Sequence, residues 1–320
     1  IVSPNKPTTY NPVLKDLSIK KAKWEFEQGN ISKDEYDEII FLSEYAGGYL
    51  KDPVPGLYEW VIDLDFTSLY PSIIRSMNMG IETLVGRVVN SGKFDNQWSL
   101  KELKQMNPEK IVSIEKIKKD RTIATSKIQI KDLIEIIEKN DLIISAPGVM
   151  FRKDKSSVVC EILSDWFAKR QEYKALMKKA YKVDNDPVMG EFYNKRQHAY
   201  KIKLNDVYGV FAVNSWRYTD GNKFISKAIT LSGQRLLQES ITNMNDYINK
   251  QLGNIKPIDY IVTSDTDSLF IQCKDLLIAK HPDIDFNDKE DVISKILIIA
   301  TELQLMANKF IGEFSKEAFN

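Results

Sequence analysis

The chain has 320 residues, and its 45 basic and 45 acidic side chains cancel to a formal net charge of zero. This balance excludes a protein that binds polyanions through a strongly basic overall charge, so any contact with nucleic acid must rest on local basic clusters. The length allows a large hydrophobic core and two or three structural units.

The spacing of the cysteines and the length of the apolar runs argue against disulfide-stabilised, zinc-binding and membrane-spanning proteins. Cys160 and Cys273 are far apart and have no Cys-x-x-Cys spacing, which argues against a disulfide framework and against a zinc site. No apolar run reaches the roughly 18 residues of a membrane span, and the first residues lack the pattern of a signal peptide. We therefore expect a cytoplasmic protein with no membrane partner. Because the chain begins at Ile1 and not at a methionine, we also expect a piece of a longer protein.

The first predicted elements lie before the lysine-rich part of the chain. A polar entry leads to a helix that begins at Ser32, where Ser32 and Glu35 have the spacing of a capping box, and a glycine pair ends it. A proline-broken loop then leads into β-branched and aromatic residues over 58–66, which predict a buried strand ending at Asp65. Helical spacing follows Pro71.

The lysine-rich segment 86–145 is interpreted as an insertion. Within it, amphipathic patterns at 99–107 and 130–141 predict two short helices with weak strands between them. Two longer helices are expected next, over 156–182 and about 188–207, and the sequence DNDP between them predicts a helix hairpin.

The remaining elements form the last third of the chain. The run 209–220 is predicted as strand and turn, and 223–252 as a long helix. Two strands are expected over 259–273, meeting at a pair of aspartates, and an amphipathic helix is expected over 289–314.

Three aspartates stand where apolar strands are predicted to end, namely Asp65, Asp265 and Asp267. A single aspartate at such a place is ordinarily a turn or a cap. Several buried carboxylates brought together would repel one another unless cations neutralised them, and Mg²⁺ is a hard ion that prefers oxygen ligands. Two such ions can clamp an in-line phosphoryl displacement. The pattern alone leaves open whether Asp65 and Asp267 meet in space.

Three motifs resemble those of family B DNA polymerases and occur in the family's order. They are DFTSLYPS at 65–72, KIKLNDVYG at 201–209 and SDTDS at 264–268. The likeness extends to YAGG at 45–48, and GYLKDPVPGLYEWV, FAKRQEYK and AITLSGQ are similar to segments of T-even-type phage polymerases. Together these motifs cover 45–270 apart from the segment 86–145.

The resemblance implies an α+β fold: a polymerase palm with an antiparallel sheet flanked by helices, interrupted by a two-helix fingers hairpin. The implied domains are an entry segment leading into the palm at 1–50, palm with motif A at 51–85, the insertion at 86–145, a return to the palm at 146–156, fingers with motif B at 157–213, and palm with motif C and a C-terminal helix at 214–320. An exonuclease and a thumb, which family members normally carry, are expected to be missing from this chain.

The resemblance also implies a metal site. Asp65 and Asp267 would bridge two Mg²⁺ ions, or Mn²⁺ in their place, with the carbonyl of Phe66 as a further ligand. Asp265 would lie close by and support the metals or the primer end.

The first group of residues expected to bind the deoxynucleoside triphosphate comes from the motif at 65–72. Ser68, Leu69 and Tyr70 would form a turn whose backbone N–H groups bind the phosphates, as suits the start of a helix. Tyr70 would lie under the sugar and exclude a 2′-hydroxyl.

Basic residues on the predicted hairpin complete the expected site. Arg170 and Lys174 are four residues apart on one helix and match the family's cations for the β and γ phosphates. Lys201 would contact the phosphates and protonate the leaving group, with Asn205 one turn later. Tyr208 and Gly209 would lie near the nascent base pair and the template. The family has serine after that asparagine, and this chain has Asp206, which puts local packing in doubt.

The implied activity is template-directed DNA polymerase, a nucleotidyltransferase that acts on primer-template DNA and dNTPs by a two-metal mechanism. A phage-encoded enzyme would work in the cytoplasm of its bacterial host. A separate or missing exonuclease and thumb polypeptide is the expected partner. Two alternatives stay open: a polymerase-derived assembly or nucleic-acid-binding subunit whose catalysis has lapsed, and a protein-primed polymerase, because 86–145 occupies the place of that branch's extra element.

Overall fold

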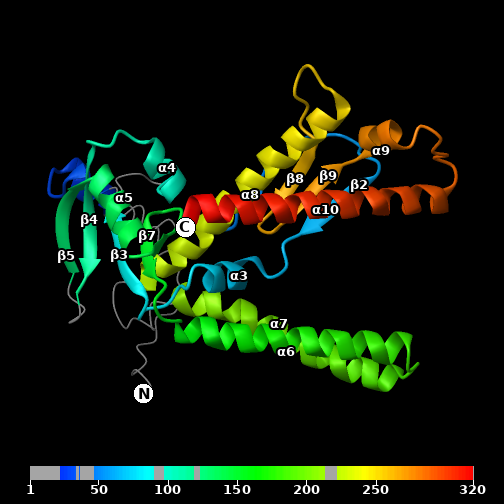
Figure 1. The fold of residues 1–320 in the computed structure, drawn as a ribbon, viewed down its shortest axis with the longest axis horizontal. Coiled ribbons are helices and arrows are strands. Elements are labelled where there is room, and N and C mark those ends of the chain that lie inside the picture. Colours follow the sequence, from blue (N-terminus) through cyan, green and yellow to red (C-terminus); the bar gives the residue numbers. More distant parts are fainter. Residues whose placement is uncertain are drawn as a thin grey trace. The chain divides into compact units, whose positions relative to one another are not determined.

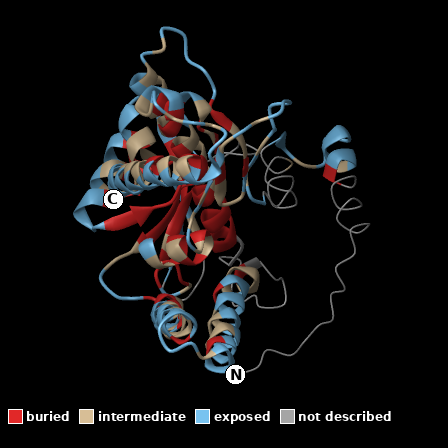
Figure 2. Ribbon diagram, turned by 90° about the vertical axis from the view of Figure 1, so that its right-hand side faces the viewer, coloured by how far each residue is buried: buried red, intermediate tan, exposed pale blue. Residues whose placement is uncertain are grey.

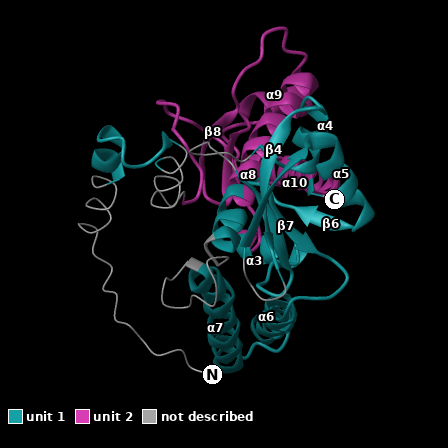
Figure 3. Cartoon of the chain, turned by 90° about the vertical axis from the view of Figure 1, so that its left-hand side faces the viewer, with its two compact units in different colours: residues 1–46, 70–231, 319–320 teal, residues 47–69, 232–318 magenta. Residues whose placement is uncertain are grey.

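The computed structural model describes residues 22–33, 36, 47–89, 97–118, 123–212 and 222–319 (Figure 1). The chain divides into two compact units (Figure 3). The first unit comprises 1–46, 70–231 and 319–320, and the second comprises 47–69 and 232–318. Glu35 lies outside the described residues, so the predicted capping box and most of its helix do too.

The second unit contains a four-stranded antiparallel sheet with the order β1-β8-β9-β2. Its strands are β1 (Leu50–Lys51), β2 (Val61–Asp65), β8 (Ile261–Asp265) and β9 (Ser268–Gln272). The predicted strand before Asp65 and the two strands that meet at the aspartates are confirmed. Because β2 pairs with β9, segments far apart in sequence become neighbours in this sheet.

Alternation along the strands gives this sheet one apolar face. Ile62 is paired with Ile271 and Leu64 with Leu269, and these side chains belong to one core cluster. Helix α8 (Asn222–Leu252) contributes Leu237 and Ile248 to that cluster, and α10 (Lys289–Phe319) contributes Ile299 and Leu303. A short helix, α9 (Lys274–Lys280), follows β9. The opposite face of β2 carries Val61, Asp63 and Asp65, and all three are exposed.

The first unit contains a five-stranded antiparallel sheet with the order β5-β4-β3-β7-β6. Its strands are β3 (Leu84–Val89), β4 (Ile111–Ile117), β5 (Ile123–Gln129), β6 (Leu142–Ile144) and β7 (Val149–Arg152). Two amphipathic helices, α4 (Leu100–Gln105) and α5 (Ile130–Lys139), add Leu103, Leu133 and Ile137 to a separate core. The lysine-rich segment therefore folds into a layered structure, and β7 from beyond it completes the sheet.

The first unit also contains a helix hairpin and a short helix. Helices α6 (Val158–Lys182) and α7 (Pro187–Ala212) lie side by side along their length (Figure 1), and α3 (Leu69–Ser76) follows the turn after β2. The Ser157 side chain caps α6 by accepting a hydrogen bond from Cys160 N–H. The expectation of a strand beginning at 209 is wrong, because α7 continues to Ala212, and 213–221 lie outside the described residues.

Figure 2 shows that buried residues concentrate on the sheets and on the inner sides of the helices. The fold is α+β, with two antiparallel sheets flanked by helices, as the sequence predicts. Within the described residues, no helix is both long enough and apolar enough to cross a membrane.

Candidate active site

Asp65 at the end of β2, Asp265 at the end of β8 and Asp267 in the turn before β9 lie at one end of the second unit's sheet. Asp65 is paired with Ser268 across β2 and β9, and Asp265 is paired with the same Ser268 across β8 and β9. The N–H of Phe66 donates to the carbonyl of Asp267 at 2.7 Å. The backbone therefore brings residues 65 and 66 beside the turn that carries Asp265 and Asp267.

These carboxylates are not buried. Asp65 and Asp265 are exposed and Asp267 is half-buried. The expectation of buried charge is wrong because the apolar residues of β2 and β9 face the helices, while Asp65 lies on the opposite, open face of the sheet. In β2, Ile62 and Leu64 pack the core, and Asp63 and Asp65 occupy the alternate, exposed positions. The core residues give the strand its apolar pattern in the sequence.

Two residues with left-handed backbone conformations adjoin the carboxylates. Ser68, in the turn between β2 and α3, has φ 54°, and Thr266, between Asp265 and Asp267, has φ 52°. A β-branched residue such as threonine rarely adopts this conformation. Strained backbone of this kind persists where surrounding contacts hold it, and it is common at active sites.

The donor set at this end of the sheet suits a hard divalent cation. Within the described part of the chain, no group of three or more His, Cys, Asp or Glu side chains is placed to hold a metal ion. Mg²⁺ needs only one or two carboxylates and takes its other ligands from water and substrate phosphates. The carboxylates of Asp65 and Asp267 are of the type and number that Mg²⁺ takes from a protein, and water and substrate oxygens would supply its other ligands.

The expected phosphate-binding cations lie on the hairpin of the first unit. The rings of Tyr173 on α6 and Tyr200 on α7 stack at 5.8 Å, so their neighbours Lys174 and Lys201 occupy the same level of the hairpin. Lys201 is exposed and Lys174 is half-buried, whereas Arg170 is only 7% exposed. Lys174 and Lys201 are therefore accessible to an anion, whereas Arg170 is buried.

Two aromatic residues predicted from different motifs meet in the first unit. The ring centroids of Tyr70 at the start of α3 and Tyr208 near the end of α7 are 4.8 Å apart. On the same helix Asn205 is exposed, and Gly209 is half-buried with open space where a Cβ would lie. Ser68 and Leu69 are half-buried and buried in the second unit.

The expected site residues thus form two groups, one in each unit. Asp65, Phe66, Asp265 and Asp267 come together in the second unit. In the first unit, the hairpin brings Lys174 level with Lys201, and Tyr208 contacts Tyr70.

Contacts around Thr266 were not anticipated from the sequence. Its hydroxyl donates to Asp265 Oδ1 at 2.9 Å, and its N–H donates to the Tyr49 carbonyl at 3.0 Å. Gly48 approaches the Thr266 side chain so closely that no Cβ would fit between them. The sequence shows the glycine pair and the threonine between two aspartates, but it does not show that they touch, because the contact depends on the pairing of β1 with β8.

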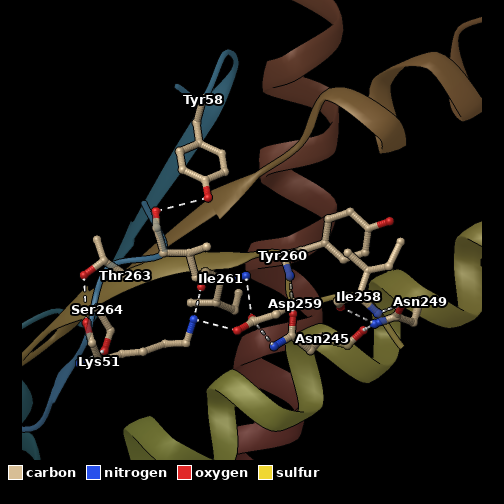
Figure 4. Close-up of polar contacts among 11 residues, drawn as sticks. Lys51, Tyr58, Asn245, Asn249, Ile258, Asp259, Tyr260, Ile261, Thr263 and Ser264 are labelled. Atoms are coloured by element: carbon tan, nitrogen blue, oxygen red, sulfur yellow. Dashed lines mark hydrogen bonds and ion pairs between the residues drawn. The ribbon is translucent and has the colours of Figure 1, made fainter. Parts of the chain in front are cut away.

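A polar network holds the start of β8 (Figure 4). Lys51 of β1 forms an ion pair with Asp259 at 2.8 Å and donates to the Ile261 carbonyl. From α8, Asn245 accepts from Tyr260 N–H at 2.8 Å, and Asn249 bonds both the N–H and the carbonyl of Ile258 at 2.8 Å. These amide side chains satisfy backbone groups just before β8 and fix the strand that leads to Asp265.

The sequence of this chain matches a known protein family over most of its length. The sequence model described as DNA polymerase family B matches residues 9–297. This chain belongs to DNA polymerase family B. The match covers all three motifs and the segment 86–145 between them.

Several family B relatives resemble the chain at low identity. The DNA polymerase of red sea bream iridovirus is 26% identical over 259 residues, which are 73% of this chain and 25% of the relative. The DNA-directed DNA polymerases of Escherichia phage RB69 and Enterobacteria phage T4 are 26% and 25% identical over 268 residues each, covering 77% and 78% of this chain. Those stretches are 28% and 29% of the phage proteins, so the chain matches only a little over a quarter of their length.

Proposed function

We propose that this chain carries the core of a template-directed DNA polymerase, which transfers deoxynucleotides from dNTPs to the 3′-hydroxyl of a primer. The observation that carries the proposal is the pairing of β2 with β9, which sets Asp65 beside Ser268 and bonds Phe66 N–H to Asp267. Membership of DNA polymerase family B supports it.

Asp65 and Asp267 would hold two Mg²⁺ ions, with the Phe66 carbonyl as a further ligand and Asp265 beside them. When bound, such ions lower the charge on the reacting phosphate and stabilise the attacking and leaving oxygens. The exposure of Asp65 suits this role, because a triphosphate and a primer end can reach an exposed carboxylate.

Cations from the hairpin would bind the departing pyrophosphate. Its charge grows as the α-phosphorus is transferred, so fixed positive groups stabilise the transition state more than the substrate. Lys174 and Lys201 suit this role because they lie at one level of the hairpin and are accessible. Lys201 would also donate a proton to the pyrophosphate. Arg170 would support them chiefly by packing, because it is buried.

The turn at Ser68 and Leu69 would present backbone N–H groups to the triphosphate. Tyr70 would then limit the space at the sugar, with its ring supported by Tyr208. Asn205 and Gly209, on the same helix as Tyr208, would border the triphosphate and the nascent base pair respectively.

Duplex binding would require more than this chain. Proteins hold duplex DNA through many phosphate contacts, and the chain matches only a little over a quarter of the length of the phage polymerases. We infer that a thumb and an exonuclease come from other parts of the same protein or from a partner polypeptide. The chain by itself would then bind primer-template weakly and extend it by one or a few nucleotides per encounter.

A primer-extension assay with Mg²⁺ tests the proposed activity. Asp267→Asn is compared with Asp63→Asn, which removes an exposed carboxylate on the same face of β2 as Asp65, two residues before it. We expect extension to fall by on the order of 10²-fold or more in the first variant and to stay within about twofold in the second. Equal extension by the wild type and Asp267→Asn would reject this site, and no extension by the wild type would favour the lapsed-subunit alternative.

A further inference from the structure

The glycine pair before β1 runs directly beside the turn that carries Asp265 and Asp267. Leu50 of β1 is paired with Asp265, so the residues just before it lie next to the end of β8. The Tyr49 carbonyl accepts a hydrogen bond from Thr266 N–H at 3.0 Å. This bond joins the segment 47–49 to the one residue that separates the two aspartates.

Gly48 is in close contact with the side chain of Thr266. A Cβ built on Gly48 would lie 2.8 Å from both Cβ and Cγ2 of Thr266, and nearer still to its Oγ1. These distances are shorter than side-chain carbon atoms tolerate, and the opposing atoms belong to a β-branched residue with little rotational freedom. Any larger residue at 48 must therefore displace the turn.

The segment that carries Gly48 is held from its other side as well. Gln234 on α8 donates from its Nε2 to the Gly47 carbonyl at 2.7 Å. The side chain of Tyr49 packs against the core cluster of the second unit. Because contacts hold both neighbours of Gly48, we expect a Cβ at position 48 to displace Thr266 and not the segment 47–49.

Thr266 connects this contact to a carboxylate. Its hydroxyl donates to Asp265 Oδ1 at 2.9 Å, and its backbone has the unfavourable φ of 52°. The Asp267 N–H donates to the Asp265 carbonyl at 2.5 Å, which closes the turn. A shift of Thr266 would therefore alter the direction of both aspartates.

We propose that Gly48 and Thr266 form a positioning contact that sets the orientation of Asp265 and Asp267 for binding a divalent cation. Neither residue touches the ion: Gly48 supports Thr266, and Thr266 orients the carboxylates. The proposal rests on the proposed function only in taking these aspartates as the cation site.

Binding of Mn²⁺ alone to the full chain, followed by electron paramagnetic resonance, tests the contact without requiring catalysis. Gly48→Ala is compared with Gly47→Ala, because a Cβ at Gly47 would meet nothing within 4 Å. We expect Gly48→Ala to weaken Mn²⁺ binding by about tenfold, as removal of a residue that orients a ligand commonly does, and Gly47→Ala to leave it unchanged. Equal affinities in the two variants would overturn the proposal, as would a wild type that binds no Mn²⁺.

A double-mutant cycle shows whether the effect runs through Thr266. Thr266→Gly removes all three atoms that a Cβ at Gly48 would meet. If the contact acts as proposed, the double variant Gly48→Ala/Thr266→Gly binds Mn²⁺ no more weakly than Thr266→Gly alone. If the two substitutions instead weaken Mn²⁺ binding independently, so that their fold-changes in affinity multiply in the double variant, Gly48 does not act through Thr266 and the proposal is overturned.

Two further variants keep the test decisive if Gly48→Ala does not fold. Thr266→Val preserves the shape of the side chain and loses the hydroxyl, and Thr266→Ser keeps the hydroxyl. We expect the valine variant to weaken Mn²⁺ binding several-fold and the serine variant to retain it; equal binding by both would contradict the proposal. A chain whose Mn²⁺ binding follows these expectations and is lost in Asp267→Asn, yet extends no primer, would refute the proposed function alone.

Discussion

The rings of Tyr70 and Tyr208 lie 4.8 Å apart with their planes inclined by 31°. These residues come from the first and second motifs of the sequence, separated by the five-stranded sheet and most of the hairpin. Aromatic pairs at this distance contribute packing energy beyond their buried area. The pairing gives Tyr70 a fixed ring orientation, which a residue that excludes a 2′-hydroxyl would need.

Shortening Tyr70 should relax the choice of sugar. In Tyr70→Ala we expect the preference for dNTPs over ribonucleotides, measured as the ratio of kcat/KM values in primer extension, to fall by on the order of tenfold to a hundredfold. Tyr70→Phe should keep the preference, because the ring supplies the obstruction. A Tyr70→Ala variant as selective as the wild type would show that this ring does not face the sugar.

The Tyr247 hydroxyl should make stability depend on pH in the alkaline range. Burial and a hydrogen bond to the Glu302 carboxylate raise the pKa of Tyr247 from 10.0 to about 12. Because the pKa is raised in the folded state, the contribution is complete below about pH 10 and is lost as the pH rises through 12. We expect Tyr247→Phe to lower the free energy of unfolding by about 1 kcal/mol at pH 8.

Urea unfolding of the wild type and Tyr247→Phe from pH 8 to pH 12 measures this difference. It should shrink across the upper two pH units as the phenol ionises. Tyr58→Phe is the matched control, because its hydroxyl donates an exposed hydrogen bond to the Val54 carbonyl. A difference between the wild type and Tyr247→Phe that stays constant to pH 12 would contradict the assignment.

Asn249 should stabilise the approach to β8. Its side chain bonds the N–H and the carbonyl of Ile258, each at 2.8 Å, and Asn249→Ala leaves both groups to water. We expect the free energy of unfolding to fall by about 1–2 kcal/mol. Asn243→Ala, which removes one bond to a carbonyl of its own helix, should change it by less than about 0.5 kcal/mol. Equal effects in a urea titration would show that the link to Ile258 adds nothing.

Among the basic residues of the hairpin, we expect Arg170 to contribute to stability and Lys174 and Lys201 to contribute to substrate binding. Arg170 is 7% exposed, so Arg170→Ala should lower the free energy of unfolding by about 2 kcal/mol or more, through the cavity left by its side chain. Lys174→Ala and Lys201→Ala should leave stability nearly unchanged and weaken primer extension at limiting dNTP. Thermal unfolding alongside steady-state kinetics distinguishes the two kinds of residue, and an Arg170→Ala chain of wild-type stability would contradict the separation.

Local patterns in the sequence predicted much of the fold. The strand before Asp65, the hairpin and α8 were visible from alternation, helical spacing and turn residues. The carboxyl end of α7 was not predicted. The aromatic and β-branched residues after Tyr208 favour a strand, but the helix continues through them to Ala212. The sheet around the lysine-rich segment was missed because β3 and β7 pair across a long stretch of chain.

The geometry of the candidate site also depends on pairing between distant segments, which the sequence does not show. The motifs pointed to Asp65, Asp265 and Asp267 as candidate ligands, but no local pattern specifies that β2 pairs with β9 in the register that sets Asp65 opposite Ser268. The exposure of the carboxylates and the burial of Arg170 were also beyond the sequence, because both depend on which side of an element faces a core. Thr266 and Gly48 became visible only through their contact.

Cleavage of the backbone by bound iron tests most directly whether Asp65 and Asp267 share a cation. Fe²⁺ in place of Mg²⁺, with ascorbate and peroxide, generates hydroxyl radicals that cut the chain near the ion. If the two aspartates share an ion, we expect cuts close to both 65 and 267. Both cuts should be suppressed by excess Mg²⁺ and lost in Asp65→Asn, while Asp63→Asn keeps them. Cuts near only one of the two positions, or cuts near 267 that survive Asp65→Asn, would contradict a shared ion.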